Sequence, residues 1–128
     1  PELPRCRTQG GKAMRQTAEG KGERMKRIYV IGPVTGVAEG NRPAFEAARE
    51  LLWDEGWEVE LPHDTIAPDA EWGAAMRQSI TRMLANDAVA ALPGWQRSRG
   101  AALEHSLAIA VGMLLIDLET GAHLQIGR

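Results

Sequence analysis

Four short apolar runs alternate with three segments of helical periodicity, and this alternation restricts the fold more than any other feature of the sequence. The runs are KRIYVI at 26–31, WEVEL at 57–61, AVAAL at 88–92 and MLLID at 113–117. Runs of this length, bounded by glycine and proline, are typical of strands. Strands that alternate with helices form parallel units joined by right-handed crossovers. The sequence therefore predicts a three-layer, doubly wound α/β fold, flavodoxin-like or Rossmann-like, with strand order about 2-1-3-4.

Each segment between the runs carries apolar residues at helical spacing. Asn41 is placed to cap the first helix, Pro43 suits its first turn, and Gly112 ends the third. The C-terminal GAHLQIGR is either an extra edge strand or a frayed end. The apolar positions are Phe45, Ala48 and Leu52 in the first helix, Trp72, Met76, Ile80 and Met83 in the second, and Leu103, Leu107 and Val111 in the third.

The N-terminal part of the chain is basic, whereas the rest is acidic. Residues 1–27 carry eight Lys or Arg against three acids, and the remaining residues carry seven against fourteen. We interpret residues 1–25 as a disordered or artefactual tail and residues 26–128 as one domain. The charges of the tail are interspersed with glycine, glutamine and acids, which favours this interpretation over a nucleic-acid-binding arm.

Cysteine content and hydropathy limit the cellular compartments in which we expect the protein. Cys6 is the only cysteine, which excludes an intrachain disulfide. The tail has no apolar run that would make it a signal peptide, and no later run is long enough to cross a membrane. We therefore expect a cytoplasmic protein.

Two glycine-marked loops face the point where the predicted strand order reverses. GPVTG at 32–36 follows the first strand, and PGWQRSRGA at 93–101 follows the third. Ligands of doubly wound sheets bind at this switch point, beyond the carboxyl ends of the strands. Each loop leads to a helix N-terminus, where free N–H groups and the helix dipole favour an anion. A phosphate or carboxylate ligand is therefore expected here, although GPVTG alone matches no dinucleotide or P-loop motif.

Glu104 is the first candidate for chemistry, because it lies about one turn inside the third helix. The helix dipole would keep its carboxylate ionised, which suits a nucleophile and equally suits ordinary helix stabilisation. Asp87, at the amino end of the third strand, is either a second carboxylate for acid or base catalysis or a turn residue. His63, His105 and His123 have no metal-ligand spacing, so we expect no metal site.

Taken together, IYVIGPVTG, NRPAF and NDAVAALPGWQRSRGAALEHSLAIAVG make the domain recognisable. It resembles the small phage and bacterial domains of unknown function allied to the nucleoside 2-deoxyribosyltransferases, over roughly residues 26–118. The resemblance implies cleavage of an N-glycosidic bond without a cofactor, with Glu104 as the nucleophile that forms a covalent glycosyl enzyme. It also implies that Tyr29 hydrogen-bonds Glu104 and that Asp87 assists departure of the base. Water or another base then resolves the intermediate.

One position departs from the transferases, which usually have an aspartate six residues before the nucleophile, where this chain has Ser98. A serine there is similar to the nucleotide 5′-monophosphate N-glycosidases of the same superfamily, in which it binds phosphate. The resemblance therefore favours hydrolysis of a nucleoside monophosphate over base exchange, with Arg97 or Arg99 as candidates for added charge. Trp95 is a candidate to flank the base. The predicted binding residues are Gly32, Pro33, Thr35, Gly36, Asn41, Trp95, Ser98 and Gly100.

The residues and the resemblance together leave two classes of function open. The first is an N-glycosidase or deoxyribosyltransferase that acts on a nucleoside or nucleoside 5′-monophosphate. The second is a catalytically inactive nucleotide-binding or sensing module, associated with phage, that keeps the site without turnover. Both take a small nucleoside or nucleotide as partner, without a membrane, and the resemblance implies a homodimer or higher homo-oligomer. Nucleic acid would bind only through the basic tail.

Overall fold

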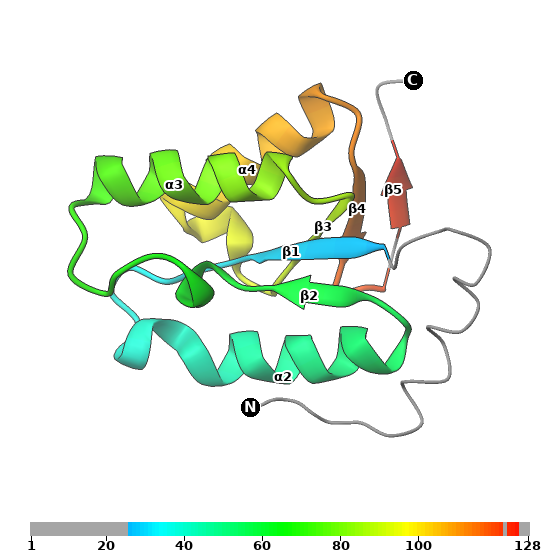
Figure 1. The fold of residues 1–128 in the computed structure, drawn as a ribbon, viewed down its shortest axis with the longest axis horizontal. Coiled ribbons are helices and arrows are strands. Elements are labelled where there is room, and N and C mark those ends of the chain that lie inside the picture. The colour runs from blue at the N-terminus through cyan, green and yellow to red at the C-terminus, as the bar shows by residue number, and fades with distance from the viewer. Residues whose placement is uncertain (1–25, 122, 126–128) are drawn as a thin grey trace.

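The computed structural model describes residues 26–121 and 123–125 of the chain. The interpretation of residues 1–25 as a disordered or artefactual tail, including Cys6, lies outside these described residues. Within them, strands and helices alternate as the sequence predicts (Figure 1). The strands are β1 (Arg27–Ile31), β2 (Glu58–Glu60), β3 (Ala88–Ala91), β4 (Leu114–Asp117) and β5 (His123–Gln125). The helices are α2 (Arg42–Asp54), α3 (Trp72–Leu84) and α4 (Arg99–Ala110), with short 3-10 turns η2 (Ala38–Asn41), η3 (Pro62–Asp64) and η4 (Trp95–Arg97).

The sheet has the order β2-β1-β3-β4-β5, which confirms the predicted order of the four parallel strands. Tyr29 in β1 lies opposite Val89 in β3, and Ala91 at the end of β3 lies opposite Asp117. β5 pairs antiparallel with β4, so the segment left open by the sequence contributes an edge strand. The strand order reverses between β1 and β3, at the switch point where ligands bind in such sheets.

Helices cover both faces of the sheet, with α2 on one face and α3 and α4 on the other (Figure 1). Successive residues of a strand point to opposite faces, so β1 contributes to two apolar cores. Ile28 and Val30 pack with Phe45 of α2, whereas Tyr29 and Ile31 belong to the core beneath α3 and α4. This second core is the layer from which the candidate site is built.

Of the apolar residues that predicted the third helix, Leu107 packs against the second core, whereas Leu103 and Val111 lie on the surface. Leu103 and Val111 have 45% and 55% of their surface exposed. The buried residues of α4 are Ala101, Glu104 and Ala108. These alanines have short side chains, which let the helix lie close to the sheet. The predicted helix is therefore confirmed, and of its three spaced apolar residues Leu107 packs against the second core while Leu103 and Val111 do not.

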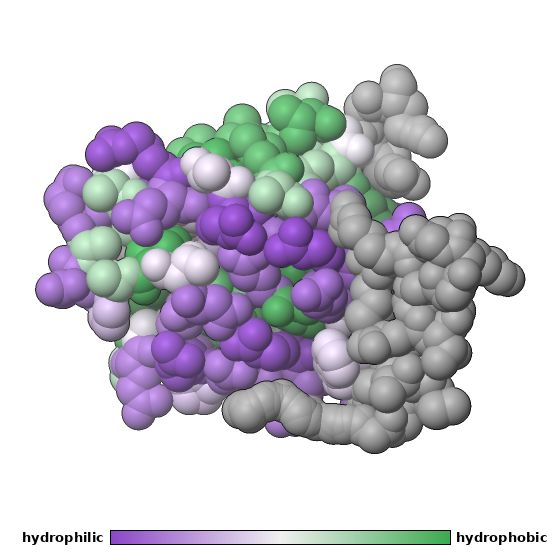
Figure 2. All heavy atoms as spheres, in the orientation of Figure 1, coloured by the Kyte–Doolittle hydropathy of each residue, from purple (hydrophilic) through white to green (hydrophobic). Residues whose placement is uncertain are grey.

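No helix in residues 26–121 has the length and the apolar character needed to cross a bilayer. The molecular surface over α2 and the adjoining loops is largely polar, whereas hydrophobic side chains gather over α4, along the upper edge of Figure 2. Leu103 of α4 and Val111, directly after the helix, are the large apolar residues exposed in this region. A helix that is apolar on its inner and outer sides is typical of a segment that is covered on both.

Candidate active site

Glu104 is the buried carboxylate of the second core. Its side chain has only 5% of its surface exposed, although it lies within two turns of the N-terminus of α4. The helix begins at Arg99, directly after the loop that leaves β3, and this connection brings Glu104 back over the carboxyl half of the sheet. Ala101 and Ala108, one turn on either side, share its buried face.

A chain of two hydrogen bonds joins Glu104 to the sheet. The Ser79 hydroxyl, from α3, donates to Glu104 Oε2 at 2.5 Å. Tyr29, from the middle of β1, places its hydroxyl 2.8 Å from Ser79 Oγ. All three side chains are buried, so these bonds form where water does not compete. The structure thus connects Tyr29 to Glu104 through Ser79, in place of the direct bond that the resemblance implied.

Burial controls the protonation of this group. It raises the pKa of Glu104 to about 7, while the hydrogen bond from Ser79 opposes that increase. Burial likewise raises the pKa of Tyr29 well above its ordinary value, so the phenol stays protonated at neutral pH. The sequence pointed to the helix dipole, which favours the ionised form, whereas in the structure loss of hydration is the larger influence and raises the pKa. A carboxyl with a pKa near 7 exchanges protons under physiological conditions, which is typical of catalytic groups.

The two oxygens of Glu104 are not equivalent. Oε2 accepts the hydrogen bond from Ser79, whereas Oε1 accepts none from the described residues. Among the described residues, the side-chain N and O atoms that have neither solvent contact nor a hydrogen-bond partner belong to residues other than Glu104. Because Oε1 has no hydrogen-bond partner, it keeps contact with solvent. One oxygen is held, and the other is free to contact a ligand.

The glycine loop after β1 is fixed by contacts that do not need a ligand. A Cβ on Gly32 would lie 2.8 Å from Leu92 Cβ, so the two loops of the switch point touch here. Gly36 has a φ of +82°, which suits glycine in a turn. Asn41 has no capping hydrogen bond from its side chain, which instead donates to the Pro33 carbonyl at 2.9 Å and closes the loop. Thr35 is exposed at the tip of this loop.

The loop after β3 leads directly to the start of α4. Ser98 is the N-cap of the helix, and its hydroxyl accepts from the Ala101 N–H at 3.2 Å. Gly100 lies against α3, where a Cβ would lie 2.9 Å from Met76 Sδ. The predicted anion cradle residues Ser98 and Gly100 therefore both have structural roles, and the free N–H groups of the first turn remain nearby.

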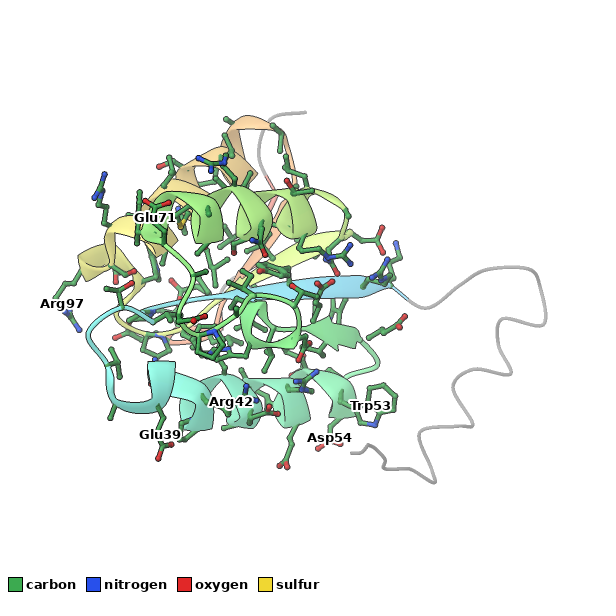
Figure 3. The ribbon with its side chains drawn as sticks, turned by 60° about the vertical axis from the view of Figure 1, so that its left-hand side comes forward. Glu39, Arg42, Trp53, Asp54, Glu71 and Arg97 are labelled. Atoms are coloured by element: carbon green, nitrogen blue, oxygen red, sulfur yellow. The ribbon has the colours of Figure 1, made fainter. Side chains whose placement is uncertain are left out.

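Trp95 lies in the same loop, with one face covered. Its indole stacks on His105, with 3.6 Å between ring centroids and an interplanar angle of 7°. Burial lowers the pKa of His105, so the stacked imidazole is neutral at pH 7. A base could stack only on the opposite face of this indole. Arg99 of this region lies 3.9 Å over the Trp72 ring. Arg97 lies at the edge of the molecule (Figure 3), where its guanidinium is 3.1 Å from the position of a Cβ on Gly94.

Asp87 is not brought together with Glu104. It lies directly before β3, at the amino end of the sheet, and its carboxylate accepts from the Arg27 N–H at 2.8 Å. Glu104, in contrast, bonds to Ser79 and through it to Tyr29 in the middle of β1.

A shallow depression of about 400 Å³ also lies away from Glu104, on the outer side of α3, where it is lined by Thr65, Ala74, Arg77, Gln78, Thr81 and Arg82.

Ser79 is the site residue that sequence reasoning missed. The apolar row of the second helix was assigned through Met76, Ile80 and Met83, and Ser79 occupies a position on the same side, one turn after Met76 and one turn before Met83. A lone hydroxyl residue within a buried row needs a hydrogen-bond partner. This requirement was the available signal, but the partner, Glu104, lies 25 residues further along the chain.

The fold is that of the nucleoside 2-deoxyribosyltransferases, which confirms the first part of the resemblance. The structure is similar to a 2-deoxyribosyltransferase from Leishmania mexicana, with a TM-score of 0.57 and 24% identity over 72% of this chain and 63% of the other. It is also similar to a conserved protein from Enterococcus faecalis V583, with a TM-score of 0.51 and 27% identity over 73% and 63%. The chain thus spans less than two thirds of either structure's length. No curated protein matches its sequence.

A family model matches the sequence and places the chain in a narrower group than the fold does. Residues 26–117 match DUF4406, a domain of unknown function, and the chain belongs to this family. The match covers all four parallel strands and the three long helices, so it includes Tyr29, Ser79 and Glu104.

Proposed function

We propose that the protein cleaves the N-glycosidic bond of a nucleoside or nucleoside 5′-monophosphate through a covalent bond between the sugar and Glu104. The observation that carries this proposal is the environment of Glu104. In a deoxyribosyltransferase-like fold, this buried carboxylate has one oxygen held and the other free, on the helix that follows one of the two loops of the switch point. A structural carboxylate gains nothing from burial with an unpaired oxygen, whereas a nucleophile requires one.

The increase in the pKa of Glu104 defines the pH range in which it can act as a nucleophile. Glu104 attacks only as a carboxylate, and its pKa is about 7. The reactive fraction therefore increases with pH and approaches its maximum above about pH 8. Burial also raises the reactivity of the carboxylate, because a desolvated anion loses less hydration when it attacks.

The N-terminus of α4 supports a phosphorylated substrate. Its first-turn N–H groups and its dipole lie beside the switch point and favour an anion. Ser98 keeps its hydroxyl at this terminus, and a serine hydroxyl that accepts one bond can still donate another. We therefore favour hydrolysis of a nucleoside 5′-monophosphate over base exchange.

A second candidate is a nucleotide-binding module without turnover. It is favoured by the position of Asp87, which bonds the Arg27 backbone at the amino end of the sheet and cannot protonate a base held near Glu104 in this arrangement. Such a module would bind a nucleotide and be stabilised by it without releasing base.

The two candidates are separated by incubation of the protein with pooled nucleosides and 5′-monophosphates, followed by chromatography of the free bases. We expect release by the wild type and none by Glu104→Gln, which keeps the size of the side chain. Glu50→Gln, on the exposed side of α2, is the matched control and should retain activity. The rate should increase with pH through about 7. Ligand-induced thermal stabilisation without any base release would support the binding module instead.

We further propose that the protein forms a homo-oligomer through α4. Leu103 of this helix and Val111, which directly follows it, expose 45% and 55% of their surface. Exposed apolar patches of this kind are typical of protein interfaces. A second copy of the chain is the simplest partner, because a two-fold interface uses the same patch twice.

A further inference from the structure

Three buried side chains that are far apart in the sequence meet in one line. Tyr29 comes from β1, Ser79 from α3 and Glu104 from α4, and of the three it is Ser79 that hydrogen-bonds both others. Ser79 has 6% of its surface exposed and Tyr29 has none. The alignment therefore depends on the packing of two helices against one strand.

The hydrogen atoms of this line fit an ionised Glu104. The Ser79 hydroxyl then donates to Oε2, and the Tyr29 hydroxyl donates to Ser79 Oγ. A proton on Oε2 would remove the acceptor of the Ser79 hydroxyl, whereas a proton on Oε1 would leave both bonds in place. The line therefore keeps Oε2 as an acceptor.

We propose that Ser79 is a positioning residue, which holds Oε2 of Glu104 and thereby assigns Oε1 as the atom that attacks the sugar, with Tyr29 acting through Ser79. This inference rests on the proposed function. Two observations carry it: Oε2 lies 2.5 Å from Ser79 Oγ, and Oε1 accepts no bond from the described residues and keeps contact with solvent. With Oε2 fixed, the carboxylate cannot rotate to exchange its two oxygens.

The chemical step follows from this assignment. Oε1 forms a bond to C1′ of the sugar while the C1′–N bond breaks, and the base leaves with that electron pair and takes a proton from water. Oε2 becomes the carbonyl oxygen of the glycosyl ester and keeps the hydrogen bond from Ser79. A water molecule then attacks C1′, the C1′–Oε1 bond breaks, and the proton lost by water passes to solvent. Glu104 returns to the carboxylate held by Ser79.

The first test is a double-mutant cycle on base release with Ser79→Ala and Tyr29→Phe. Loss of a hydrogen bond to a charged group should lower kcat about 10- to 100-fold in Ser79→Ala, with KM within about twofold. Ser79→Thr keeps the hydroxyl and should restore most of kcat. Because Tyr29 acts through Ser79, Tyr29→Phe should lower kcat in the wild type but should have little further effect in Ser79→Ala. Additive losses would overturn this part of the proposal.

The second test is titration of Glu104 by NMR of side-chain carboxyl carbons, with the signal assigned by its loss in Glu104→Gln. Removal of a bond that favours the carboxylate should raise its pKa by about one in Ser79→Ala and leave it nearly unchanged in Ser79→Thr. The acid limb of kcat against pH should move by the same amount. If Ser79→Ala does not fold, Ser79→Cys offers the same comparison with a weaker donor.

The possible outcomes separate the two proposals. Wild-type kcat and an unchanged titration in folded Ser79→Ala would overturn the role of Ser79, while inactivity of Glu104→Gln would leave the proposed function standing. Absence of base release by the wild type would instead remove the proposed function and the attack at C1′ together, whatever the titration shows.

Discussion

At the scale of single residues, Glu104 is unusual because its burial weakens the fold. An ionised carboxylate that gives up hydration for a single hydrogen bond is unfavourable, and the increase of its pKa from 4.5 to about 7 measures that cost. Natural chains retain such groups mainly where a function requires them. The instability associated with Glu104 is therefore part of the case for its chemical role.

This instability has a defined dependence on pH. Between pH 4.5 and 7 the folded chain binds more protons at Glu104 than the unfolded chain, so this group makes the free energy of unfolding fall as pH rises. We expect Glu104→Gln to resemble the wild type in stability near pH 4 and to exceed it by up to about 3 kcal/mol above pH 8.

Denaturant unfolding of both proteins at pH 4, 6 and 8 measures this difference. Glu50→Gln controls for the removal of one negative charge from an exposed position. A gap between Glu104→Gln and the wild type that stays constant across this range would mean that Glu104 keeps an ordinary pKa in the folded protein.

How well single residues can be predicted depends on how local their signal is. Glu104 was identifiable because its position in the third helix and the motif around it lie in one stretch of sequence. Its altered protonation was not, because that follows from burial against Tyr29 and Ser79, which lie in distant elements. Likewise, the Asn41 side chain proved to bond the Pro33 carbonyl, which helical capping rules do not describe.

At the scale of elements, α4 carries both its N-cap and the proposed nucleophile. Its N-cap, Ser98, satisfies the Ala101 N–H, and its buried face places Glu104 in the second core. The helix was predicted from the spacing of Leu103, Leu107 and Val111, of which only Leu107 packs against the second core. The spacing of apolar residues along a helix shows which of them share a side, but it does not show which side faces the sheet. In α4 the side that faces the sheet is the one with Ala101 and Ala108, whose short side chains allow a close approach.

Substitution of Ser98 separates the cap from a phosphate contact. Ser98→Ala removes the capping acceptor and should lower the free energy of unfolding by about 1 kcal/mol. Ser98→Asp keeps an acceptor at the N-cap and should retain the stability, but its charge repels phosphate. KM for a 5′-monophosphate should therefore rise in Ser98→Asp while KM for the matching nucleoside stays similar. Equal effects on both substrates would contradict a phosphate at this terminus.

At the scale of the whole molecule, the sheet order and the three layers follow from the alternation of strands and helices. This part was predictable because right-handed crossovers and short connections leave few arrangements. The edge strand β5 was left open because His123–Gln125 is too short to give a clear pattern, and only its pairing with β4 defines it. The outer side of α4 was equally hidden, because helical spacing alone does not say which side faces the sheet.

The exposed apolar side of α4 predicts the assembly state. Leu103→Glu combined with Val111→Glu should convert an oligomer of the wild type into a monomer, because two charges cannot be buried in an apolar contact. Leu51→Glu, at an equally exposed leucine of α2, should leave the assembly unchanged. Sedimentation velocity at several concentrations measures the difference. A monomeric wild type at tens of micromolar would contradict the proposed interface.

Because β1 packs against a core on each face, a change in its register would affect the proposed site more than the fold. Both cores next to this strand are apolar, so deletion of one residue between Arg27 and Tyr29 would still supply each of them with aliphatic side chains. The same deletion would turn the phenol of Tyr29 toward α2, on the side of the sheet opposite Ser79 and Glu104. Relatives that differ by a single insertion or deletion in this strand can therefore keep the architecture while they lose the phenol from the site.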